Sequence, residues 1–456
     1  MLHGKLFERF AEASPTTVMA RAMLENVLSE HRVDDIFKRH AVRQRCGETL
    51  FSTIVDLMSL VVLREKPSLN AAYQLRMDEI GVSIQSIYNK VDGIETQVSE
   101  ALVRETAKSF SELLALQGGT LESPVPGYRV LILDGNHLAG TDHRLKELRE
   151  LGAAALPGQV LALLDPTNQI VTDIICEEDG HAHERTLLPR VYEHLLPGNV
   201  LIGDRCFSTY KNIRELLKRS VHFVFRQHAS NLPVQELEKP KYRGRVEGGT
   251  LYEQRVKVVD ADGWECELRR ITVRLARPNR FGETEIHIIT DLPNSVPARV
   301  IHKAYRNRWS IETCFLSLAV TLRCELNTLG YPKAALFAFC VAVVMYNLLA
   351  AIKGTLRACH GIEKIEREFS LYYLAEETSS LYHGMMIALP AKNWKRTFGS
   401  MTSSELASHL QKLAMKVNLK RFRKHPRGPK KPPPKRKSGN RGNHVATSRL
   451  IALRSS

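Results

Sequence analysis

Several patterns that would define other classes of protein are missing from this sequence of 456 residues. It has eight cysteines, but none of them forms a CxxC pair and several lie in apolar runs. A zinc finger and a disulfide framework are therefore both disfavoured, and reduced thiols in a cytosolic protein are expected. The first residues, MLHGKLFERF, also lack the hydrophobic segment of a secretory signal.

Acidic residues are absent from the end of the chain. Fifteen lysines and arginines follow Glu405, the last acidic residue, which leaves 50 basic residues against 49 acidic residues in the rest of the chain. The net charge of +16 therefore belongs almost entirely to the C-terminal end. Residues 416–456 are rich in Pro and Lys, a composition that predicts a basic disordered tail. Such a tail attracts polyanions without sequence preference.

One apolar run, Ala334 to Ile352, is long enough to resemble a membrane span. It is rich in alanine, is interrupted by Asn347, and follows a segment whose charged residues have helical spacing. A membrane span would place those charged residues beside a bilayer. We therefore predict a buried helix beneath them and no membrane partner.

The N-terminal part of the chain reads as helices. Ser14 and Pro15 form a cap and first turn, and residues 50–63 are a strongly apolar helix. Residues 82–93 have the proportions of a recognition helix in a helix-turn-helix, although many small helical bundles look the same. We predict a helical DNA-binding domain over residues 1–120, followed by a Gly- and Pro-containing linker from Gln117 to Tyr128.

Alternating strand and helix patterns follow the linker. A three-strand meander is expected first, then a helix, a strand, a helix and a strand, at residues 128–141, 158–166, 169–180, 183–195, 199–209, 210–219 and 221–228. A small antiparallel β insertion with a hairpin at Asp262-Gly263 is predicted for residues 229–280. A strand at 285–293 returns to the core. We therefore expect a catalytic core at 125–228 and 281–330, and a helical C-terminal region at 331–415.

The segment AYRNRWSIETCF, residues 304–315, brings functional side chains onto one helix. No Pro or Gly occurs between Ala298 and Glu325, which predicts one continuous helix. Steps of three and four residues would place Tyr305, Arg308 and Glu312 on one face. Apolar residues are available to anchor this helix in a core: Val300, Ala304, Trp309, Phe315 and Leu316. Taken alone, Arg308 and Glu312 read as an ordinary ion pair on a solvated face.

Two aspartates at the ends of hydrophobic strands change that interpretation. Asp134 ends the apolar run VLILD and Asp204 ends the run VLIGD. With Glu312 they form a set of three carboxylates, which suits two Mg²⁺ ions in phosphoryl transfer. Strand-end caps are the alternative role for the two aspartates. Their order along the chain predicts an α/β, ribonuclease-H-like fold with an antiparallel β insertion, flanked by helical regions.

The chain resembles a DDE transposase of the insertion sequence four family, the Y-R-E-K type. The resemblance covers roughly residues 125–350 and is carried by Asp134, Asp204 and the block Tyr305-x2-Arg308-x3-Glu312. Trp309, the strand IITDLP and the run DGHAHERTLL also fit. The motif normally ends in a Lys at the position that Ala319 occupies here. The phosphate contact of that Lys is therefore in doubt, with Arg323 as a possible substitute.

The resemblance implies cleavage at the ends of a mobile element, a hairpin intermediate, and strand transfer by the freed 3′-OH. It assigns two Mg²⁺ ions, with Mn²⁺ as an alternative, to Asp134, Asp204 and Glu312. It also implies that Arg308 clamps a phosphate and that Tyr305 hydrogen-bonds one near the hairpin. The expected partners are double-stranded DNA, as element ends and target, and a second copy of the chain in a synaptic homodimer. The expected location is the bacterial cytoplasm, in association with the nucleoid.

Two other functions and several other residues stand as alternatives. A structure-specific Mg-dependent DNA nuclease would use the same residues, and a non-catalytic, transposase-derived DNA-binding protein is favoured only by Ala319. Asp142, Asp165 and Asp173 lie near the same strands, but turn or mid-strand positions favour structural roles. His181 and His183 have no third nitrogen or sulfur ligand nearby in the sequence and are expected simply to begin a helix.

Overall fold

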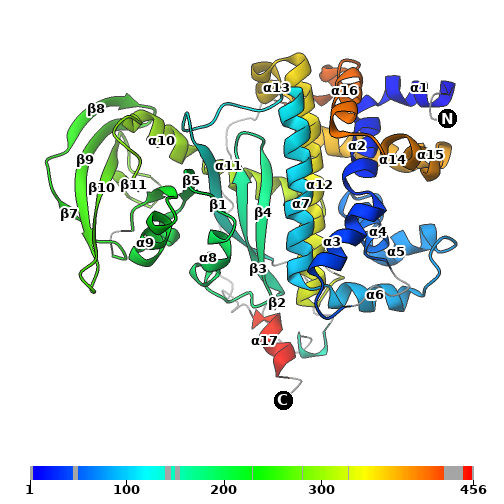
Figure 1. Cartoon of the computed structure of the whole chain (residues 1–456), viewed down its shortest axis with the longest axis horizontal. Helices are drawn as coiled ribbons and strands as arrows, with labels where there is room; N and C mark the ends of the chain where they lie inside the picture. Colours follow the sequence, from blue (N-terminus) through cyan, green and yellow to red (C-terminus); the bar gives the residue numbers. More distant parts are fainter. Residues whose placement is uncertain are drawn as a thin grey trace.

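The computed structural model describes residues 4–44, 50–138, 145–148, 155–228, 230–279, 281–326, 328–425 and 445–453. Asp142, one of the acidic residues near the predicted strands, lies outside these ranges. Figure 1 shows strands at the left and centre and helices at the right, with two long helices, α7 (Thr96–Gln117) and α12 (Pro332–His360), side by side between them.

The centre of the molecule is a mixed sheet in the order β4-β3-β1-β5-β6. Strands β1 (Arg129–Leu138), β3 (Gly158–Asp165) and β4 (Ile170–Glu177) form the predicted antiparallel meander, and every residue of β3 is buried. Strands β5 (Asn199–Gly203) and β6 (His222–Arg226) are parallel to β1. Helices α8 (Glu184–Tyr192) and α9 (Tyr210–Lys218) supply the crossovers that parallel strands require. This topology is the ribonuclease-H-like core that the sequence predicted.

The β insertion continues this sheet rather than forming a separate one. Strands β7 (Gln235–Glu236), β8 (Lys241–Val246), β9 (Gly249–Val259) and β10 (Glu265–Leu275) pair antiparallel. Strand β11 (Glu285–Thr290) pairs with β10 on one side and β6 on the other. Gly263, with φ of +82°, makes the predicted turn between β9 and β10. The insertion is therefore fixed to the core through a shared strand.

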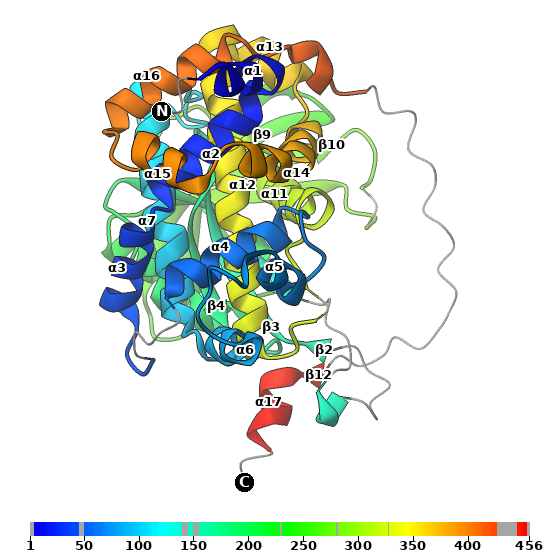
Figure 2. The ribbon, with the colours of Figure 1, turned by 90° about the vertical axis from the view of Figure 1, so that its right-hand side faces the viewer.

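Helices from both ends of the chain form one layer. The N-terminal helices are α1 (Lys5–Ala13), α2 (Pro15–Val27), α3 (Glu30–His40), α4 (Phe51–Val62), α5 (Leu69–Arg76), α6 (Ile84–Gly93) and α7. The C-terminal helices after α12 are α13 (Ile362–Glu368), α14 (Leu371–Ala388), α15 (Ala391–Phe398) and α16 (Ser403–Ala414). Helix α2 packs on α14, α15 and α16, while α12 packs on α4, α6 and α7 (Figure 2). The predicted helical regions 1–120 and 331–415 therefore share one hydrophobic core.

Helix α12 contains the apolar run that resembles a membrane span. Its most apolar window has a mean hydropathy of 2.4, which by length and composition would suffice to cross a membrane, and all of that window is buried inside the protein. Asn347, the polar interruption, uses its side-chain amide to donate to the Val171 carbonyl at 2.8 Å and to accept from the Val171 amide at 2.9 Å. The amide therefore ties α12 to strand β4, and the prediction of a buried helix is confirmed.

The C-terminal segment is more ordered than its composition predicted. Residues Leu419–Phe422 form a 3₁₀ turn, and Phe422 packs its buried ring against Phe369. Further on, β12 (Val445–Ala446) pairs with β2 (Ala155–Leu156), and α17 (Thr447–Ala452) follows. The prediction of disorder is therefore wrong for residues 416–425 and 445–453, because these stretches find partners far back in the sequence. Residues 426–444 lie outside the described ranges.

Candidate active site

The two predicted aspartates come from neighbouring parallel strands. The last paired residues of β1 and β5 are Ile132 and Ile202, and each aspartate lies two positions further along its strand. Strand β5 ends at Gly203, whereas β1 continues to Leu138 against β3 alone, so Asp134 lies within its strand rather than at the end. Asp204 also accepts a hydrogen bond from the Cys206 amide at 2.6 Å, so it caps the following 3₁₀ turn.

The predicted helix from Ala298 to Glu325 is in fact two helices. Helix α10 (Ala298–Arg306) ends in a turn at residues 307–308, and α11 (Trp309–Thr321) begins directly after it. The side chains of Trp309 and Leu316 are 55% and 54% exposed, so they do not anchor the helix as expected. The buried side of α11 consists of other residues: Ile311, Cys314 and Leu318. The turn changes which residues face the core, and no Pro or Gly announces it in the sequence.

Arg308, at this turn, joins two of the three predicted carboxylates. Its Nη1 lies 3.0 Å from Oδ2 of Asp134, and its Nη2 lies 2.5 Å from Oε1 of Glu312. Only 11% of the Arg308 side chain is exposed, and its Nε is buried without a hydrogen-bond partner among the described residues. The ion pair with Glu312 is therefore one part of a bridge that reaches Asp134, 174 positions earlier in the chain.

Asp204 and Tyr305 interact electrostatically with the residues of this bridge. Burial raises the pKa of Asp134 to about 7; Arg308 opposes this rise, and the charge of Asp204 adds to it. Burial also raises the pKa of the Tyr305 hydroxyl, against the effect of Arg308 and Arg226, and Asp204 raises it further. A buried carboxyl group whose ionisation is costly favours a positively charged partner. Arg308 is the cation that contacts it in the structure.

A fourth carboxylate, Glu184, belongs to the site and was missed from the sequence. It begins α8, and a Cβ atom added at Gly135 would collide with its carboxylate oxygen. Burial raises the pKa of Glu184, as does the charge of Asp204, while the neighbouring Cys206 thiol lowers it. Its position in the run DGHAHERTLL, in the first turn of a helix after the third strand, was the available signal. Arg226, at the end of β6, was also missed: its charge lowers the pKa of Tyr305, and its guanidinium pairs with Glu283.

Arg323 and Ala319 do not complete the cluster. Because α11 ends at Thr321, Arg323 is no longer on the helix that carries Glu312. Its guanidinium donates instead to the carbonyl of Pro67 at 2.8 Å, between α4 and α5. Ala319 is an exposed position on α11. The structure therefore gives Arg323 a role in holding the helical layer to the core, and its described residues show no substitute for the missing Lys at this place.

The alternative residues near these strands have the structural roles expected of them. Asp165 accepts from the Thr167 amide at 2.8 Å in the turn after β3. Asp173 forms a buried ion pair with Arg104 at 3.1 Å. His183 caps α8 by accepting from the Arg185 amide, and the backbone amide of His181 donates to Asp179 just before it. Asp165, Asp173, His181 and His183 therefore make structural contacts of the kind expected of them.

The donor chemistry of the site fits hard divalent cations. Asp134, Asp204 and Glu312 supply carboxylate oxygens, the ligands that Mg²⁺ and Mn²⁺ prefer. In the described part of the chain, however, no three acidic, His or Cys side chains are grouped closely enough to hold one ion. The guanidinium of Arg308 contacts Asp134 and Glu312 instead. The site therefore has the type of ligand that these cations prefer, but its carboxylates are not grouped around one position.

Two carboxylates lie where β1 and β5 part, and a third lies on a following helix. In a ribonuclease-H-like sheet, such an arrangement is typical of phosphoryl-transfer enzymes that act on nucleic acids. The comparison with protein families is more specific: residues 125–348 match the family model of the transposase DDE domain. This stretch contains Asp134, Asp204 and Glu312, and it is similar to the DDE domain of transposases.

Similarity to solved structures and to curated proteins is much weaker. The cryo-EM structure of a piggyBac transposase synaptic complex with hairpin DNA is similar with a TM-score of 0.41 and 11% sequence identity. The match covers 89% of this chain and 86% of that chain. This similarity is too distant to assign a residue or a partner. No curated protein is similar enough to match the sequence.

Proposed function

We propose that the chain is a DNA transposase of the insertion sequence four type, which cleaves the ends of a mobile element and joins the freed 3′-OH to target DNA. The observation that carries this proposal is the bridge from Asp134 through Arg308 to Glu312, with Asp204 beside it. An ordinary surface ion pair would join Arg308 to Glu312 alone, without Asp134. A buried arginine between carboxylates from β1 and α11 instead supports a site for phosphate and cations.

The chain's own residues have distinct roles in this reaction. Two Mg²⁺ ions, or Mn²⁺, held by Asp134, Asp204 and Glu312 would activate the attacking oxygen and stabilise the leaving oxygen. Arg308 presents a planar guanidinium whose Nε has no hydrogen-bond partner among the described residues, which suits a phosphate oxygen. The Tyr305 hydroxyl lies beside Arg308 and Asp204 and would hydrogen-bond a phosphate of the hairpin. Water or a 3′-OH attacks, so no protein nucleophile is required.

Double-stranded DNA is the proposed partner, both as element end and as target. The helical layer formed by residues 1–120 and 331–415 is the proposed region for recognition of the element ends. A homodimer would hold two ends together, and a cytoplasmic, nucleoid-associated location in a bacterium follows from these roles. Because α12 is enclosed by other helices and by β4, the dimer contact would use helices on its outside.

A cleavage and joining assay tests the proposal. Duplex DNA with the terminal sequences that flank the coding region is incubated with the full chain and Mg²⁺, and nicked, hairpin and joined products are resolved. Glu312→Gln is expected to abolish all products. Glu363→Gln, the same change at an exposed position on α13, is expected to have no effect. Nicks without joined products would indicate a nuclease, and bound but uncut DNA would indicate a non-catalytic binding protein; either result would overturn the proposal.

A further inference from the structure

The outer face of α10 carries a row of basic side chains that the proposed chemistry does not use. Arg299, Lys303 and Arg306 follow one another at steps of four and three residues, so they lie on one side of the helix, and all three are exposed. The opposite side is buried against the sheet through Ala298, Ile301 and Ala304. This helix therefore presents an apolar face to the protein and a cationic face to solvent.

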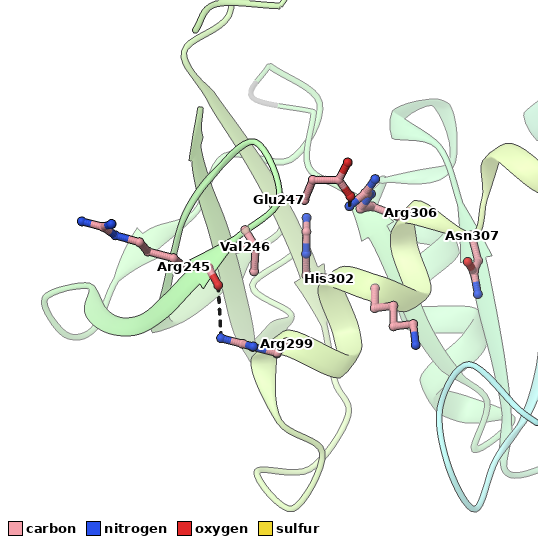
Figure 3. Close-up of a pocket in the computed structure, with 8 residues that line it drawn as sticks. Arg245, Val246, Glu247, Arg299, His302, Arg306 and Asn307 are labelled. Atoms are coloured by element: carbon pink, nitrogen blue, oxygen red, sulfur yellow. Dashed lines mark hydrogen bonds and ion pairs between the residues drawn. The ribbon is translucent and has the colours of Figure 1, made fainter. Parts of the chain in front are cut away.

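A cleft separates this cationic face from the insertion. It has a volume of about 560 Å³ and is lined by α10 on one side and by residues 245–247, at the end of β8, on the other (Figure 3). Arg299 donates across the cleft to the Arg245 carbonyl at 3.1 Å. Gly244, with φ of +113°, bends β8 beside the Arg299 guanidinium. The hairpin between β8 and β9 therefore forms one wall of a groove whose other wall is α10.

Charge in the cleft is strongly unbalanced. The acidic residue that lines it, Glu247, pairs with Arg306 at 2.7 Å. Arg299 and Lys303 form no ion pair with any described residue. His302, only 8% exposed, has its pKa lowered by burial and by Arg306, so it stays neutral and can serve as a hydrogen-bonding group. Two unpaired cations in a groove call for an anionic ligand.

The cleft reaches the turn that carries Arg308. Its last lining residue, Asn307, directly precedes Arg308, which contacts Asp134 and Glu312. At 1.5 Å per residue, Arg299 and Arg306 are about 10 Å apart along α10. One DNA strand advances about 3.4 Å per phosphate along the helix axis. The row of cations therefore matches the length of roughly three consecutive phosphates.

We propose that the cleft between α10 and the β8–β9 hairpin binds the phosphodiester backbone of the DNA strand that runs into the active site. This inference rests on the proposed function in taking DNA as the ligand. It gives Arg299 and Lys303 a separate role, because they hold the strand beside the reacting phosphate and take no part in the chemistry. The insertion then supplies one wall of the strand's path.

The test measures DNA binding of the full chain as a function of salt. The probe is a fluorescent duplex that carries the terminal sequence flanking the coding region, and the variant is Arg299→Ala with Lys303→Ala. Each lost phosphate contact reduces the slope of log K against log salt by about 0.9. The double variant is therefore expected to lower the slope by about 1 to 2 and to weaken binding most at low salt.

A control is available outside the helical layer, on the face of the sheet opposite α10. Lys211→Ala with Lys218→Ala on α9 also removes two exposed positive charges. This control is expected to leave the slope within about 0.5 of the original chain. An equal fall of the slope in both double variants would overturn the inference, because it would show only a general effect of net charge.

Two further measurements make the test independent of the chemistry. Glu247→Gln removes the acidic side chain that lines the cleft and is expected to tighten binding, so weaker or unchanged binding would count against the inference.

A competition experiment compares inorganic phosphate with unlabelled duplex at the same concentration of phosphate groups. Inorganic phosphate should displace the probe far less than the duplex does. Equal displacement would show that the cleft binds single anions and would overturn the proposed strand path. If the chain does not cleave DNA but shows the change in slope, the proposed function is overturned while strand binding in the cleft is still supported.

Discussion

Arg308 and Asp134 form a partly buried ion pair at 3.0 Å that joins the turn before α11 to the middle of β1. The same guanidinium contacts Glu312, so one side chain holds two carboxylates that would otherwise repel each other. This relationship gives Arg308 two roles that can be separated by experiment. One is to neutralise the site in the absence of metal, and the other is to contact phosphate during the reaction.

Arg308→Lys separates these two roles. Lysine keeps the positive charge, but its compact ammonium cannot reproduce the planar two-pronged contact with both carboxylates or with a phosphate. We expect a loss of about 100-fold in the single-turnover rate of cleavage, typical of removing one aligned donor, with little change in melting temperature. The rate is measured with saturating element-end DNA and Mg²⁺. Arg367→Lys on α13, in an exposed ion pair, is the control and should retain the full rate.

The raised pKa of Asp134 makes stability depend on pH in a defined direction. Because its folded-state pKa is about 7 and its ordinary value is 3.8, the folded chain binds more protons than the unfolded chain between these values. Stability contributed by the protonated group is therefore lost as the pH rises towards 7. Between about pH 5 and pH 8, we expect the original chain to lose ~2 kcal/mol more unfolding free energy than Asp134→Asn.

Urea unfolding with a metal chelator present measures this difference. Mg²⁺ should reduce it in the original chain, since a bound cation favours the ionised carboxylate. Equal pH dependence of the two proteins would show that Asp134 is not held protonated by its surroundings.

Gly135→Ala tests the position of Glu184. The added methyl group meets the far end of a flexible side chain, so Glu184 is displaced while the fold is retained. We expect a change of less than about 1 kcal/mol in stability but a clear fall in Mg²⁺-dependent cleavage. Combining Gly135→Ala with Glu184→Ala removes the collision, and the double variant should be no less active than Glu184→Ala alone. A fully active Gly135→Ala would show that the placement of Glu184 does not matter.

Asn347→Ala tests the connection between α12 and β4. The change leaves the buried amide and carbonyl of Val171 without their partner, and we expect a cost of about 2–4 kcal/mol in unfolding free energy. Chemical denaturation followed by circular dichroism provides the measurement. Asn89→Ala on the exposed face of α6, whose side-chain bond to Gln85 is exposed, should cost less than about 0.5 kcal/mol. Similar losses in the two variants would argue against a special role for Asn347.

Much of the core was predictable because short stretches of sequence indicate its strands and turns. The strands are dense in apolar and β-branched residues, and the turn at Asp262-Gly263 has its own signature. Asp134 and Asp204 were identifiable because each follows an apolar run, and Glu312 because of its spacing from Tyr305 and Arg308. Asp134 and Glu312 meet at Arg308, and the charge of Asp204 acts on Asp134. The signals that identified these residues each lie within a short stretch of sequence.

The remaining features depend on partners that are distant in the sequence. The turn at Asn307 and Arg308 forms without Pro or Gly, so helical periodicity placed Trp309 and Leu316 on the wrong side. Arg323 looked like a spare cation for DNA, but carbonyls between α4 and α5 take its hydrogen bonds. Glu184 is part of the site because Gly135 leaves room for it, which only the pairing of strands reveals. Composition likewise could not show that Phe422 would reach Phe369.

Helix α12 has a consequence for how the chain is made. An apolar stretch of this length emerging from the ribosome is a candidate for insertion into a lipid bilayer by the secretory machinery. Helices α13, α14 and α16, which also pack on α12, are translated later, but α4, α6, α7 and β4 are translated earlier and are available to bury it as soon as it appears. Synthesis from the N-terminus therefore provides protein surfaces that can bury this helix before it can enter a membrane.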